Sequence, residues 1–243
     1  MGGALQIRYE LKSLGDTQIA SSYKKYLKSP YNFYGVRIPH LRKISKEYSK
    51  KISSIYDAYN LFDELWFSGN HEEMSLAIFL LQNFKKQFSM EMWDFLMVPK
   101  ILEKLKTWDH VDALSTGIIG NILLNNPHLN SYAKRLACSE NPWLRRMSIV
   151  SQLPAIKKGK IHLAVLLAEK LVYDEDIYVQ KAAGWMMREV GKKNRAQLEE
   201  FAKIHRNMKL TAFNYSLEKM PKTFKVYIKN LKKEDKEKKE NVG

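Results

Sequence analysis

Residues 54–67, SIYDAYNLFDELWF, carry the pattern that decides the fold. Apolar side chains recur there every three or four positions, at Ile55, Tyr59, Leu61, Phe62, Leu65 and Trp66. This spacing places them on one face of an α-helix, which must be buried against another element. Residues 72–86, 160–172, 174–192 and 208–219 show the same period, and no persuasive alternating strand pattern occurs. The sequence therefore predicts an all-α protein of about a dozen helices.

Three further segments recur at a regular interval along the chain. Trp108 begins WDHVD, Trp143 begins WLRRMSIVSQL and Tyr178 begins YVQKAAGWMMREV, so each start lies 35 residues after the one before. Such a period is typical of stacked helix pairs that form an α-solenoid with equivalent helices on one concave surface. We expect one repeat domain over residues 1–230 and a charged, frayed helical tail over residues 231–243.

Positive charge is concentrated in the folded part of the chain. The net charge is +15, and the tail from residue 232 to residue 240 contributes only +1 of it. Residues 24–51, called here the basic segment, carry nine cations against Glu47 alone: Lys24, Lys25, Lys28, Arg37, Arg42, Lys43, Lys46, Lys50 and Lys51. Five aromatic residues are interleaved with them. This pattern suits the phosphate backbone of a nucleic acid, although a simply solvated basic helix face explains it as well.

Several classes of protein and site are disfavoured by the sequence. The longest apolar runs are too short for a membrane span, and the charges at Arg8, Glu10 and Lys12 lead us to expect no signal peptide. A single cysteine, Cys138, excludes an intramolecular disulfide and fits a reducing cytoplasm. There is no Gly-rich phosphate loop, HExxH or GxSxG motif, and the six histidines are scattered. We therefore expect neither a cofactor nor a metal.

The segment TWDHVDALS (residues 107–115) carries the best candidates for chemistry. Trp108 and Asp112 are four residues apart, so they share one face of a helix. Asp109 and His110 point elsewhere, and Asp109 suits an N-cap or the positive end of the helix dipole. A carboxylate beside an indole can stabilise a developing cation. An ion pair between Asp112 and an arginine of a neighbouring repeat is an equally good interpretation.

Four segments together resemble the AlkD-like DNA alkylation repair family of HEAT-like repeat glycosylases. They are FYGVRIPHLRKI (33–44), TWDHVDALS (107–115), WLRRMSIVSQL (143–153) and YVQKAAGWMMREV (178–190). Their order and spacing are similar to those of the family over roughly residues 20–220. The resemblance implies excision of positively charged alkylpurines, such as N7-alkylguanine and N3-alkyladenine, from duplex DNA without base flipping.

The resemblance also implies which residues act. A catalytic set would consist of Asp112, Trp108, Trp185 and Arg146. Contacts to DNA would come from Tyr26, Arg37, Arg42, Lys43 and Arg188. The expected partner is double-stranded DNA containing alkylated bases, and we expect a monomer located in the cytoplasm at the nucleoid. Two alternatives stay open: a non-catalytic HEAT-like protein that binds damaged DNA, and a HEAT-type scaffold for an acidic protein.

Overall fold

The computed structural model describes residues 3–240, with the backbone alone for residues 236 and 238–240. The chain divides into two compact units, Met1–Ile122 and Leu123–Gly243. Over the described residues both units are built from helices, and the one β-type pairing is an isolated bridge between Asn32 and Asn70. The prediction of an all-α fold is confirmed.

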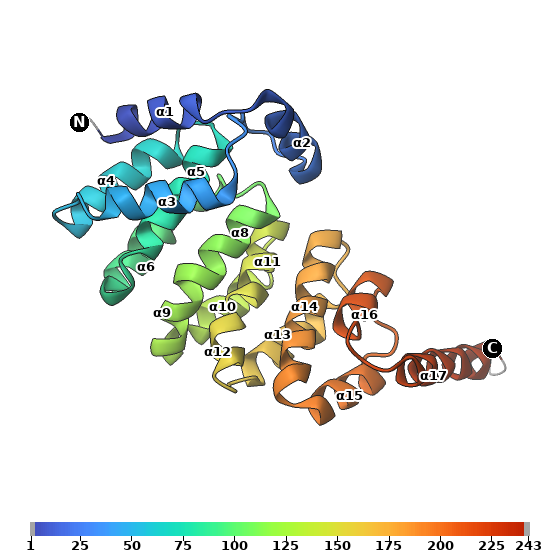
Figure 1. The fold of residues 1–243 in the computed structure, drawn as a ribbon. Helices are drawn as coiled ribbons and strands as arrows, with labels where there is room; N and C mark the ends of the chain where they lie inside the picture. The colour runs from blue at the N-terminus through green and yellow to red at the C-terminus, as the bar shows by residue number, and fades with distance from the viewer. Residues whose placement is uncertain (1–2, 241–243) are drawn as a thin grey trace. The chain divides into compact units, whose positions relative to one another are not determined.

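The first unit packs its helices around α5. Its α-helices are α1 (Gly3–Ser13), α2 (Thr17–Leu27), α3 (Ile38–Ser49), α4 (Ile55–Trp66), α5 (His71–Gln82), α6 (Met90–Leu96), α7 (Pro99–Leu102) and α8 (Trp108–Leu114). A short 3₁₀ helix, η1 (Lys85–Gln87), follows α5, and a π-helical stretch, η2 (Ser115–Ile119), follows α8. Every residue of α5 except Gln82 is buried, because α3, α4 and α8 pack around it (Figure 1).

The second unit packs its helices around α14. The helix α9 (Gly120–Asn125) leads into it, followed by η3 (Pro127–Leu129), α10 (Asn130–Leu136), α11 (Pro142–Val150), α12 (Leu153–Lys157), α13 (His162–Leu171), α14 (Ile177–Lys193), α15 (Arg195–Ile204), α16 (Leu210–Ser216) and α17 (Lys222–Glu240). The helices α11, α13, α15 and α16 all pack on α14 (Figure 1). A Cβ at Gly184 would lie 2.6 Å from the backbone oxygen of Ala212, so glycine there permits the close approach of α14 to α16.

Helices begin where the regular spacing placed them. The starts of α8, α11 and α14 are Trp108, Pro142 and Ile177. Asn141 and Asp176 cap the second and third of these helices: Asn141 accepts one hydrogen bond from a backbone N–H group of the first turn, and Asp176 accepts two. The α-solenoid class of repeated helix packing is thereby confirmed, whereas a basic concave face stays a prediction.

The described chain contains more helices than the dozen expected, because several are only four to seven residues long. Residues 231–240 belong to α17, and residues 241–243 lie outside the described part. The single domain over residues 1–230 and the frayed tail after it stay predictions. Within residues 3–240 no helix is both long enough and apolar enough to cross a membrane.

Candidate functional site

The helix α8 separates the residues of TWDHVDALS onto two faces, as its period predicts. His110 and Val111 are buried in the first unit, whereas Trp108 and Asp112 are half-buried on the opposite side. Tyr26 of α2 meets the Trp108 indole edge-on, with ring centroids 6.0 Å apart and an interplanar angle of 87°. Because Tyr26 is 70% exposed, its ring and the indole form a solvent-facing aromatic pair one turn from Asp112.

Asp109 and His110 belong instead to a buried cluster with His71. The Nε2 atom of His71 lies 2.8 Å from Asp109 Oδ2, and the two imidazole rings stack with centroids 4.0 Å apart. Burial lowers the pKa of His110 to about 3. Burial also works to raise the pKa of Asp109, but the hydrogen bond with His71 and the attraction of both imidazoles outweigh it and hold that pKa well below its usual range. The N-cap residue of α8 is Thr107, so the N-cap interpretation of Asp109 was wrong; Asp109 lies in the first turn of the helix and binds His71.

This histidine cluster is an arrangement that the sequence did not predict. One ligand atom from each of His71, Asp109 and His110 falls within 4.8 Å of the others, which is close enough to consider a metal ion. However, the rings stack almost parallel, so their in-plane lone pairs do not converge on one point. His110 Nε2 also lies 3.0 Å from Ser75 Oγ. The cluster is better explained as a buried hydrogen-bonded support for α8.

The helix α8, which carries Asp112, is followed directly by a wider, π-helical stretch. Residues Ser115–Ile119 are π-helical, a rare geometry that often occurs at functional sites. Side chains donate to four carbonyls around this stretch: Thr116 Oγ1 to Asp112, Gln82 Nε2 to Ala113, and Asn121 Nδ2 to both Thr116 and Gly117. The run Ser115, Thr116 and Gly117, each a poor residue for a helix interior, is the sequence signal that could have indicated it.

A buried carboxylate fixes the loop that leads into the basic segment's second helix. Glu72 Oε1 accepts from the backbone N–H groups of Gly35 at 2.7 Å and Val36 at 3.2 Å, and Oε2 accepts from that of Tyr34 at 3.1 Å. Gly35 has φ +87°, and a Cβ there would collide with the backbone oxygen of Asp16. The motif FYGVRIPHLRKI is thus held at its start by Glu72, which sequence reasoning missed.

All nine cations of the basic segment are exposed. Arg37 is the N-cap residue of α3, and Arg42 and Lys43 follow on that helix. The Arg42 guanidinium lies over the Phe79 ring, 4.1 Å from its centroid, and Nη1 lies 3.4 Å from Gln82 Oε1. Arg42 is therefore held in place, whereas the Lys43 side chain is 75% exposed and makes only a 4.0 Å contact with Glu47.

In the second unit the two adjacent arginines of α11, Arg145 and Arg146, are both bound by other residues of the chain. Arg145 binds both oxygens of Asp174, at 2.6 and 2.9 Å, which raises the pKa of its guanidinium. Arg146 is 5% exposed, and its Nη1 donates to the backbone oxygen of Tyr178 at the start of α14.

Trp185 and Arg188 lie one turn apart on α14, as their spacing predicts. Trp185 is half-buried and packs against the core of the second unit, so it has a structural role too. The Arg188 guanidinium is ion-paired with Glu218, and the hydrogen bond from Lys219 and the charge of Arg188 lower the pKa of that carboxyl. Any contact of Arg188 with DNA must compete with this ion pair.

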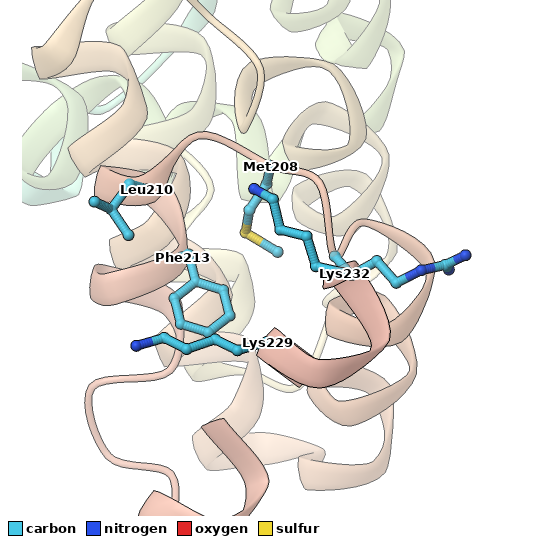
Figure 2. A pocket seen from close by; sticks show the side chains of 6 residues that line it. Met208, Leu210, Phe213, Lys229 and Lys232 are labelled. Carbon is cyan, nitrogen blue, oxygen red and sulfur yellow. The ribbon is translucent and has the colours of Figure 1, made fainter. Parts of the chain in front are cut away.

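A small pocket of about 50 Å³ lies between α16 and α17. Figure 2 shows the Phe213 ring below Met208, with the Lys229 side chain running along its lower edge. The Lys229 nitrogen lies 5.9 Å from the ring centroid, and Arg206 is bound by Asp235. Ligand pockets usually measure about 300–1,000 Å³, so this one is too small to receive a nucleobase.

Comparison with known families matches residues 7–220 to the family described as DNA alkylation repair enzyme. The chain belongs to this family. The structure is also similar to that of a predicted DNA alkylation repair enzyme from Enterococcus faecalis, with a TM-score of 0.73 and 21% identity, over 86% of this chain and 97% of that one. This similarity shows a shared fold. No match was found among curated proteins.

Membership of the DNA alkylation repair enzyme family confirms the resemblance found in the sequence and indicates DNA as the partner. The structure brings Trp108 and Asp112 to one half-exposed face of the first unit, beside Tyr26. Arg146 and Trp185 lie in the second unit. The roles of these residues, and of Arg37, Arg42, Lys43 and Arg188, stay predictions.

Proposed function

We propose that this protein is a DNA glycosylase that hydrolyses the N-glycosidic bond of positively charged alkylpurines, such as N7-alkylguanine and N3-alkyladenine, in duplex DNA. One observation carries the proposal beyond family membership. The indole of Trp108 and the carboxylate of Asp112 share a half-exposed face of α8, while Asp109 and His110 of the same motif are committed to the core.

The chemistry needs few groups. An alkylated purine that is already cationic is a good leaving group, so its departure requires no general acid. The sugar left behind acquires oxocarbenium character, and a nearby carboxylate stabilises this charge and orients the attacking water. The electron-rich face of an indole also favours positive charge close to it. Asp112 would supply the carboxylate, and Trp108 and Trp185 would pack on the deoxyribose.

Phosphate contacts would hold the duplex during this reaction. Arg146 and Arg188 are assigned to phosphates that flank the lesion, and Tyr26, Arg37, Arg42 and Lys43 to the neighbouring backbone. The exposure of the whole basic segment supports the second assignment. We propose that the lesion is approached from the backbone and remains stacked, in contrast to the usual extrusion of a base into a pocket. A monomer associated with the nucleoid in the cytoplasm completes the proposal.

A protein of the same family that binds damaged DNA without cleaving it is the second candidate. The burial of Arg146 favours it, because this member of the catalytic set is 5% exposed and already donates to the backbone oxygen of Tyr178. A scaffold for acidic proteins is less well supported, since family membership indicates DNA.

The test uses a duplex with a single N7-methylguanine, incubated with protein and then cleaved with alkali at abasic sites. We expect excision well above the spontaneous rate, and a loss of about 100-fold or more in Asp112→Asn with duplex affinity retained. Asp94→Asn, an exposed acid of α6, is the matched control and should behave as wild type. Duplex binding without excision would establish the non-catalytic alternative. Equal rates for Asp112→Asn and wild type would refute the role of this carboxylate.

A further inference from the structure

We propose that Gln82 is a positioning residue that links Arg42 to the backbone carrying Asp112, so that phosphate binding at α3 sets the geometry of the catalytic carboxylate. This inference rests on the proposed function. Gln82 is the last residue of α5 and the only one in that helix that is not fully buried. It lies between the exposed basic segment and the π-helical stretch after α8.

The side-chain amide of Gln82 makes a contact at each end. Its Nε2 donates to the carbonyl oxygen of Ala113 at 2.8 Å, and its Oε1 lies 3.4 Å from Arg42 Nη1. Because an amide group is planar and rigid, its two ends cannot reorient independently. A displacement of Arg42 is therefore transmitted to the peptide group between Ala113 and Leu114, the second one after Asp112.

The π-helical stretch leaves room for the Gln82 side chain beside Gly117. A Cβ at position 117 would lie only 2.1 Å from Gln82 Nε2, and all three of its nearest atoms would belong to the Gln82 side chain. Glycine at 117 therefore leaves the space that Gln82 occupies. Thr116 Oγ1 donates to the carbonyl of Asp112 at 2.7 Å, so the two peptide groups that follow Asp112 are both held by side chains.

Arg42 is suited to sense a phosphate. Its guanidinium is exposed yet restrained by Phe79, with five N–H donors of which the contact with Gln82 occupies one. A phosphate would bind the remaining donors and draw the guanidinium toward the DNA, which tightens or shifts the 3.4 Å contact. Asp112 would then reach its productive orientation only when the DNA backbone is bound correctly on α3. Binding in this position would therefore favour the reaction.

The decisive variant is Gln82→Met, which keeps the length of the side chain and removes both polar ends. We expect its single-turnover excision of N7-methylguanine to fall about tenfold, because small misplacement of a reacting group has a large effect on rate. Its dissociation constant for the same duplex should change less than about twofold, because the phosphate contacts remain. Asn83→Leu is the matched control: it removes contacts to Phe79 and Ser45 at the same end of α5 without touching α8.

A double-mutant cycle separates a link from two independent effects. If Arg42 acts through Gln82, the variant carrying both Arg42→Met and Gln82→Met should excise no more slowly than the slower single variant. Multiplicative losses would overturn the inference. So would a Gln82→Met rate within twofold of wild type, or one no lower than that of Asn83→Leu.

Amide hydrogen exchange provides a readout that does not depend on catalysis. Saturation with an undamaged duplex should slow exchange over residues 111–121 in the wild type, and this change should be lost in Gln82→Met although the duplex still binds. If the wild type excised nothing, the proposed function would be refuted, but amide exchange would still test whether Gln82 links Arg42 to the backbone that carries Asp112. No change in the wild type would overturn the link, even if excision were normal.

Discussion

Replacing Glu72 by alanine removes the carboxylate that holds the loop before α3. Glu72 is 1% exposed and accepts three backbone N–H bonds, from Tyr34, Gly35 and Val36. Water cannot easily replace a partner at a buried position. Hydrogen bonds to a charged group contribute roughly 1.5 kcal/mol or more each, so Glu72→Ala should lower the free energy of unfolding by about 4–5 kcal/mol. Since many proteins are stable by only about 5–15 kcal/mol, the effect should be large.

The geometry also predicts the effect of a smaller change. In Glu72→Gln the amide oxygen can replace Oε1, which serves Gly35 and Val36, while the amide nitrogen faces the N–H of Tyr34. One of the three hydrogen bonds is lost, so we expect the free energy of unfolding to fall by about 2 kcal/mol. Glu47→Ala is the control, because its carboxylate is 49% exposed and only 4.0 Å from Lys43; its effect should stay below about 0.5 kcal/mol.

Urea unfolding followed by circular dichroism measures all three variants. Amide exchange at Gly35 should accelerate in Glu72→Ala before global unfolding, and duplex affinity should fall because the loop orients Arg37. The reasoning is refuted if Glu72→Ala unfolds within about 1 kcal/mol of wild type, or if Glu72→Gln is as unstable as Glu72→Ala.

Two further predictions concern pH and charge. His110 has a folded-state pKa of about 3, below its unfolded value, so its neutral form stabilises the fold above pH 6.5 and this contribution is lost as pH falls. The free energy of unfolding should drop by up to about 1.4 kcal/mol per pH unit below pH 6.5, and less steeply in His110→Gln. Urea unfolding at several pH values measures both slopes, and equal slopes for the wild type and the variant would contradict the prediction. Glu218→Gln should remove the ion pairs of this carboxylate with Arg188 and Lys219, while the 3.8 Å contact of Arg188 with Glu189 stays, and strengthen duplex binding severalfold at low salt, measured by fluorescence anisotropy. Unchanged affinity would show that Arg188 does not contact DNA.

The parts of the candidate site that lie on a single helix were predictable. The separation of Trp108 and Asp112 from His110 follows from 3.6 residues per turn, and burial confirms it. Asp109 is half-buried as they are, and its hydrogen bond with His71 sets it apart. The regular spacing likewise located the starts of α8, α11 and α14.

Contacts between helices escaped prediction because the partners are distant in sequence. Gln82 and Ala113 are 31 positions apart, and Glu72 and Tyr34 are 38 apart. Nothing in the local pattern around Gln82 or Glu72 indicates a partner on another helix. The stacking of His71 on His110 was missed for the same reason, since six scattered histidines gave no ligand spacing.

The sequence by itself determined the helical class, the main faces of the helices and the pairing of an indole with a carboxylate on α8. These properties depend on periodicity and capping, which act within a few residues. Tertiary structure decided which polar side chains support that pair: His71 beneath Asp109, Gln82 against the π-helical stretch and Glu72 within the loop before Arg37. A buried polar group must find its partner wherever packing brings one within hydrogen-bonding distance, and the register of packed helices sets that distance.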